Sequence, residues 1–126
     1  MLIAIWIFSV VLGLFFAAAG FTKAFSPMAE VRKMPWAKEF EDSTIRLIGY
    51  SEIAGGVGLI APLATGILVW LSTLAALCLA ILMIGATATH VRIKDPVGAA
   101  VTSAVLASAS LALAILSGAN QFLPLA

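Results

Sequence analysis

The sequence predicts an all-α integral membrane protein, a four-helix bundle with a short interfacial segment between its first and second helices. Of its 126 residues, 63% are hydrophobic and only 10% are charged. The mean hydropathy of +1.15 lies outside the range of ordinary soluble domains. The apolar residues also fall into four long runs separated by charged or turn-forming segments. These observations together predict a polytopic membrane protein.

The four predicted membrane spans are residues 2–22, 46–61, 67–89 and 97–117. A helix needs about 20 residues to cross roughly 30 Å of hydrocarbon. In lipid the backbone of such runs must be helical, because no water is present to satisfy its polar groups. Four spans occupy most of the chain, so we expect residues 1–126 to form one domain.

The first span is expected to stay in the protein, although the segment at Ala17 to Ala19 also fits a signal-peptidase site, because no basic residue precedes the run. The second and third spans are joined by a short link containing Pro62 and Gly66, which predicts a tight antiparallel hairpin. The link before the fourth span predicts another hairpin, with Pro96 in the first turn of the last helix.

The first loop, residues 23–44, mixes charges with apolar side chains and is expected to lie at the headgroup level. Pro27 and Pro35 interrupt it, so we expect a short helix over about 27–33, a bend, and a further turn or two before the second span. Two interpretations stay open for this segment. It is either a solvated connector whose aromatic side chains anchor it at the interface, or a lid over a pocket.

All basic side chains lie at one end of the predicted bundle. By the positive-inside rule, the first and third loops should be cytoplasmic and both termini outside, and we expect a bacterial inner membrane. The residues concerned are Lys23, Arg32, Lys33, Lys38, Arg46, Arg92 and Lys94.

Glu52 is a lone carboxylate in the second span. A charge in hydrocarbon costs roughly 3 kcal/mol or more, so such a residue normally faces a partner or a polar pocket. Lys23 ends the first span and His90 ends the third, both at the depth where Glu52 lies, which makes them its candidate partners. Gly49 and Gly56, three and four residues from Glu52, share its helix face.

The predicted ligand-binding or polar cluster comprises Lys23, Glu52, His90, Gly49, Gly56 and Trp36. A purely structural interpretation stays open for each part of it. The ion pair would then only fix helix register, the glycines would only pack helices, and His90 would only cap the third helix.

The sequence carries no motif for a metal site and no haem, flavin or iron–sulfur ligand set, so we expect no intrinsic cofactor. Cys78 is the lone cysteine, which excludes an internal disulfide, and we expect it to be packed as a small apolar side chain. Nucleic-acid binding is not supported, because acids balance the bases of the first loop.

The chain carries three short motifs, Gly20 to Lys23, Glu52 to Pro62, and Ile84 to His90. These motifs resemble the DoxX-like family of small four-helix membrane proteins, and the resemblance spans nearly the whole chain. It implies an accessory role in membrane redox chemistry. The chain is also distantly similar to EXPERA-type sterol isomerase and sigma-two-receptor bundles, which implies that Glu52 faces a lipophilic ligand in a pocket open to the bilayer.

Two functions follow as expectations. The first is a redox-associated accessory or binding subunit that holds a lipophilic small molecule, a quinone or another lipid, near Glu52 and His90. Such a subunit would dock a cytoplasmic protein partner through its first loop, and its small-residue faces also permit a homodimer. The alternative is a small isomerase, cyclase or hydratase in which Glu52 and His90 are the catalytic proton shuttle and Lys23 tunes the carboxylate.

Overall fold

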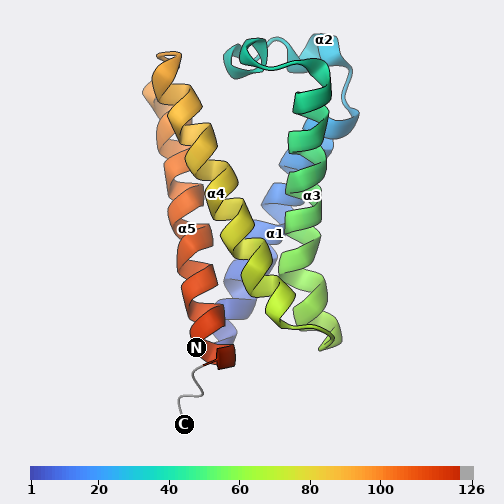
Figure 1. Ribbon diagram of the computed structural model, residues 1–126, viewed down its shortest axis with the longest axis vertical. Helices are drawn as coiled ribbons and strands as arrows, with labels where there is room; N and C mark the ends of the chain where they lie inside the picture. The colour runs from blue at the N-terminus through green and yellow to red at the C-terminus, as the bar shows by residue number, and fades with distance from the viewer. Residues whose placement is uncertain (123–126) are drawn as a thin grey trace.

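The computed structural model describes residues 1–122, which form helices joined by short links and contain no strand. Four long helices run the length of the molecule, with a folded segment at one end (Figure 1). The predicted all-α four-helix bundle is confirmed, and a short segment links its first and second long helices. In chain order the elements are α1 (Leu2–Phe25), α2 (Met28–Val31), the 3-10 helix η1 (Pro35–Glu39), α3 (Asp42–Thr65), α4 (Trp70–Arg92) and α5 (Val97–Phe122).

Each of the four long helices has the length and apolar composition needed to cross a membrane. Their outward faces are apolar too. On α1, for example, Ile3, Ile7, Val11 and Leu14 are all exposed and follow helical spacing along one stripe. Such a surface suits lipid, where the helices satisfy their own backbone groups. The chain is therefore an integral membrane protein.

The helix ends differ from the predicted spans by a few residues. Both α1 and α3 continue past the apolar runs into flanking polar residues, because a helical backbone stays satisfied into the headgroup layer. Residues 67–69, expected in the third span, instead belong to the turn before α4. Gly66 (φ 69°) and Leu68 (φ 49°) are left-handed, and the Gly66 N–H donates to the Pro62 carbonyl to end α3.

The bundle consists of two closely packed helix pairs, α1 with α3 and α4 with α5, and the contacts between pairs are fewer. Glycines bring α1 and α3 together. A Cβ atom on Gly20 would lie 2.5 Å from the Gly49 carbonyl oxygen, and one on Gly56 would lie 2.5 Å from the Gly13 carbonyl oxygen. No side chain fits between the backbones at these points, as in other close membrane-helix contacts.

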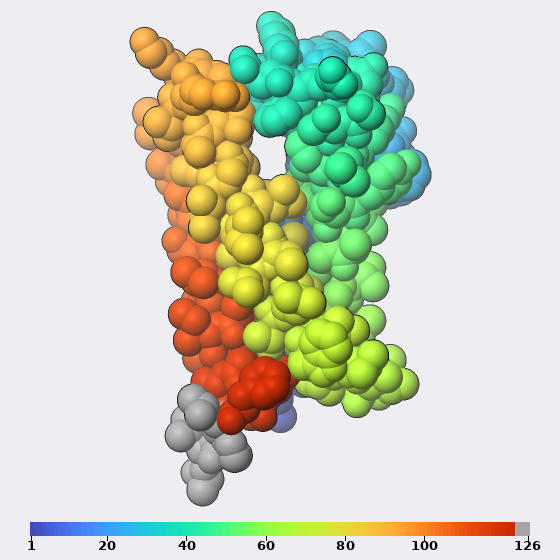
Figure 2. All heavy atoms as spheres, in the orientation of Figure 1, coloured from blue at the N-terminus to red at the C-terminus, as the bar shows by residue number. Residues whose placement is uncertain are grey.

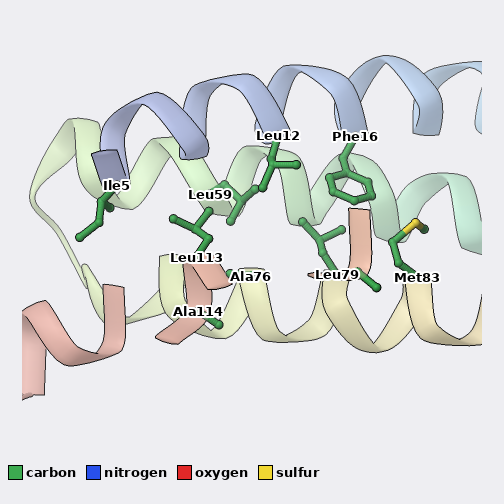
Figure 3. Packing of buried hydrophobic residues seen from close by; sticks show 10 residues of the cluster. Ile5, Leu12, Phe16, Leu59, Ala76, Leu79, Met83, Leu113 and Ala114 are labelled. Carbon is green, nitrogen blue, oxygen red and sulfur yellow. The ribbon is translucent and has the colours of Figure 1, made fainter. Parts of the chain in front are cut away.

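An apolar core joins the two pairs from the terminal end of the bundle to its middle (Figure 3). Phe16 on α1 and Met83 on α4 are its members nearest the loop end. Beyond them the two pairs diverge, as the separation of α4 and α3 in Figure 1 shows. The core comprises Ile5, Leu12, Phe16, Leu59, Ala76, Leu79, Met83, Ala107, Leu113 and Ala114.

The segment between α1 and α3 is folded over this diverging end. Val31, Ala37 and Ile45 form a small core of its own, with Trp36 and Phe40 packed against it. The Arg32 guanidinium donates to the carbonyl oxygens of Ala37 and Phe40 and pairs with Asp42. These contacts fix the segment in place above the helices.

Candidate functional site

A cavity of about 730 Å³ lies between the two helix pairs at the loop end. Figure 2 shows an opening at this end, between α4 and the side of the molecule formed by α3. The four long helices and the segment around η1 all contribute to its wall. The lining residues are Phe15, Phe16, Ala19, Lys23, Trp36, Phe40, Ile48, Glu52, Ile81, Leu82, Met83, Gly85, Ala86, Thr89, His90, Gly98, Ala99, Thr102, Ser103 and Leu106.

The wall changes character along the bundle. Next to the core the wall is apolar and includes Phe16, Met83 and Leu106. Lys23 and His90 lie in the last turns of α1 and α4 at the loop end, and Glu52 meets the Lys23 ammonium from further along α3. Gly85 on α4 and Gly98 on α5 also line it. A Cβ atom on either glycine would meet no heavy atom within 4 Å, so both border open space.

Lys23 and Glu52 form a bidentate ion pair across α1 and α3. The Lys23 Nζ donates to both carboxylate oxygens, at 3.1 and 2.9 Å. The Glu52 side chain is 2% exposed and the Lys23 side chain 19%. The same Nζ lies 5.7 Å from the centroid of the Trp36 ring, a cation–π contact that joins η1 to the pair.

The close approach of α1 and α3 brings the Lys23 and Glu52 side chains together. Gly20 lies one turn before Lys23, and Gly49 lies one turn before Glu52, in two antiparallel helices. Each charged side chain leans toward the N-terminus of its own helix, so the two meet at the glycine contact. Arg46 fixes the end of α1 by donating to the carbonyls of Lys23 (3.1 Å) and Ser26 (2.8 Å). These are carbonyls that a helix end leaves unsatisfied.

His90 and Asp95 form a second polar pair on the other side of the cavity. The His90 Nδ1 lies 2.7 Å from an Asp95 carboxylate oxygen, and the side chains are 14% and 5% exposed. The Asp95 N–H also donates to the His90 carbonyl at 3.0 Å. The carboxylate favours a proton on Nδ1, which leaves Nε2 as an acceptor in the neutral ring.

The structure brings four of the six predicted site residues to one cavity: Lys23, Trp36, Glu52 and His90. Lys23 is the partner of Glu52, as one of the two predicted pairings had it. His90 instead pairs with Asp95, the sole acid of the third loop, which is not among the predicted site residues.

Gly49 and Gly56 lie in the α1–α3 contact and not in the cavity wall. Residues three or four apart share a broad face of a helix, but that face of α3 is divided between α1 and the cavity.

Cys78, expected to be packed, is exposed on the outer surface of α4. A thiol is apolar enough to face lipid as well as a core.

Comparison with known proteins identifies the family. The sequence model of the DoxX-like family matches residues 7–115, which include all of α3 and α4, most of α1 and α5, and the Lys23–Glu52 and His90–Asp95 pairs. Comparisons with curated proteins and with solved structures give no match. Because the matched region covers most of the chain, this membrane protein belongs to the DoxX-like family.

Proposed function

We propose that this protein binds a lipophilic small molecule between its two helix pairs, with the polar head of the molecule at the loop end. The supporting observation is the cavity of about 730 Å³, whose wall is mostly apolar and includes the ionisable side chains of Lys23, Glu52 and His90. This volume falls within the range typical of small-molecule sites, which are mostly apolar with a few placed polar groups.

A quinone or a similar lipid fits this division of the wall. Its ring would lie among Trp36, Phe40 and the two polar pairs, and its tail would follow the apolar wall past Phe16 and Leu106. We assign the protein an accessory role in membrane redox chemistry, consistent with its resemblance to redox-associated relatives. The exposed charges around α2 and η1, such as Lys38 and Glu41, offer a docking surface for a cytoplasmic protein.

Filling the cavity is expected to remove the ligand. In Gly85→Phe the new ring would enter the open space next to Gly85, whereas in the control Ala88→Phe the ring lies on an exposed part of α4 outside the cavity lining. Lipid extracts of the two purified variants and the wild type should be compared by mass spectrometry. We expect one compound to fall at least about tenfold in Gly85→Phe and to persist in Ala88→Phe, a change of about 1.4 kcal/mol or more in binding.

The identity of that compound decides the ligand class. A quinone supports the redox assignment, and another lipid in its place would contradict that assignment while supporting the binding role. If the wild type and both variants yield the same extract, the cavity holds no retained ligand and the proposed function is wrong.

The His90–Asp95 pair favours a second candidate, a small isomerase, cyclase or hydratase. An imidazole whose Nδ1 is held by a carboxylate has the arrangement of a general base, and Glu52 lines the same cavity. On this proposal His90→Gln would retain the bound compound but no longer convert it. A wild-type protein that leaves the recovered compound chemically unchanged over long incubation would exclude this candidate.

We also propose that the loop end faces the cytoplasm of a bacterial inner membrane, because every Lys and Arg of the sequence lies toward this end. In a Cys78→Ala background, Ile67→Cys should react with an impermeant maleimide on intact cells. Lys38→Cys should react only after the cells are permeabilised, because residues 38 and 67 are exposed at opposite ends of the bundle. The opposite labelling pattern would reverse the orientation.

A further inference from the structure

The ionisable groups that line the cavity are already engaged with each other or with a neighbour. They are Lys23, Glu52 and His90, and Asp95 lies against His90. Each carboxylate at the cavity already has a partner, because Glu52 pairs with Lys23 and Asp95 pairs with His90. Two hydrogen bonds of the Lys23 ammonium go to the Glu52 carboxylate, so among residues 1–122 no unpaired Lys or Arg side chain lines the cavity.

The other cations held near this end do not supply one. Arg46 donates to backbone carbonyls, Arg32 is bound within the loop segment, and Arg92 lies 3.6 Å from Glu39. Neither these three residues nor Lys33, Lys38 and Lys94 line the cavity. An anionic head group there would meet carboxylates without a matching charge, and like charges brought together in an interface are strongly unfavourable.

The hydroxyl groups of the cavity wall also restrict which head groups can form hydrogen bonds there. Thr89 donates to the Gly85 carbonyl, Thr102 to the Gly98 carbonyl, and Ser103 to carbonyls in the same turn of α5. Their protons are therefore used within their own helices, and what they present to the cavity is oxygen lone pairs. The Glu52 carboxylate is an acceptor as well.

From these partners and acceptors we propose that the cavity selects lipophilic molecules whose head group is uncharged and donates hydrogen bonds, such as an alcohol or a phenol, and rejects anionic head groups. Of a quinone and its reduced form, the quinol, which is a phenol, is therefore the one that fits. The Lys23–Glu52 pair is the specificity determinant, because the carboxylate neutralises the Lys23 ammonium that would otherwise attract an anion. This inference rests on the proposed binding function and names the chemical class of its ligand.

A matched set of probes tests this selectivity. Three amphiphiles share one chain that carries bromine near the head and differ only in that head: a primary alcohol, its methyl ether, and a sulfonate. Bromine quenches tryptophan on contact, and Trp36 lines the cavity. With Trp6→Phe and Trp70→Phe, Trp36 is the one tryptophan left to report binding. The protein is held in nanodiscs, and Gly85→Phe in the same background gives the quenching caused by probe in the bilayer alone.

We expect saturable quenching by the alcohol, several-fold weaker binding of the ether, and sulfonate binding weaker by at least about tenfold. Sulfonate binding as tight as that of the alcohol would overturn the proposed selectivity and leave the binding function standing. If no probe quenches Trp36 beyond the Gly85→Phe background, the binding function fails and the selectivity with it.

Removing the Glu52 carboxylate should raise the affinity of the cavity for the sulfonate probe. In Glu52→Gln the Lys23 ammonium loses its counter-charge, so sulfonate binding should rise at least about tenfold. The double variant Lys23→Met/Glu52→Gln removes that cation and should lose the gain. If Glu52→Gln does not fold, Asp95→Asn, which removes the other carboxylate, should also raise sulfonate binding. Sulfonate binding that stays unchanged in every folded variant would show that the carboxylates do not set the selectivity.

Discussion

Lys23→Met should lower the free energy of unfolding by about 3 to 5 kcal/mol, because it leaves the Glu52 carboxylate buried without its cation. The Glu52 side chain is 2% exposed, and both of its oxygens accept hydrogen bonds from Lys23. This decrease in the free energy of unfolding reflects the cost of a buried, unpaired carboxylate more than the strength of the Lys23–Glu52 ion pair. The double variant Lys23→Met/Glu52→Met, which removes both charges, should therefore recover most of the lost stability.

Reversible unfolding in mixed micelles measures this effect through a double-mutant cycle. Lys33→Met provides the matched control, since Lys33 pairs with Glu30 on the exposed loop segment. Its stability should lie within about 1 kcal/mol of the wild type. A double variant no more stable than Lys23→Met alone would show that packing, and not the unpaired charge, explains the loss.

Gly49→Ala should be strongly destabilising, whereas Gly85→Ala should not. A Cβ atom on Gly49 would lie 2.6 Å from the Ala24 backbone nitrogen and 2.8 Å from the Gly20 carbonyl oxygen, so α1 and α3 must separate to admit it. Overpacking of this kind costs about 1 to 3 kcal/mol, and Gly49→Leu should prevent the pair from docking. At Gly85 no atom lies within 4 Å, and alanine is the better helix former by up to about 1 kcal/mol.

Thermal unfolding followed by size-exclusion chromatography distinguishes these variants. The Gly49→Ala protein should also lose the ion pair, because moving α1 away from α3 draws Lys23 away from Glu52. Equal melting temperatures for Gly49→Ala and Gly85→Ala would contradict the glycine contact as the element that holds α1 against α3.

Several features follow from the sequence by itself. Four apolar runs of spanning length determine the helices, because hydrocarbon permits no other continuous backbone. Pro27 and Pro35 divide the first loop into the two short elements that the structure contains. Glu52 required a partner, and the sequence offered two candidates, Lys23 and His90, of which Lys23 forms the pair. Each of these features depends either on the spacing of residues along the chain or on the free-energy cost of a charge in lipid.

Only the tertiary structure determines which residues of a helix face contact a neighbouring helix and which line the cavity. It assigned Gly49 and Gly56 to the α1 contact and Glu52 to both α1 and the cavity, although all three occupy one broad face of α3. It also gave His90 a partner five residues along the chain, because the turn after α4 folds Asp95 back onto the ring. The cavity itself arises where two tightly packed helix pairs diverge beyond their common core. No local pattern encodes that divergence, because it depends on which helices become neighbours and how closely each pair packs.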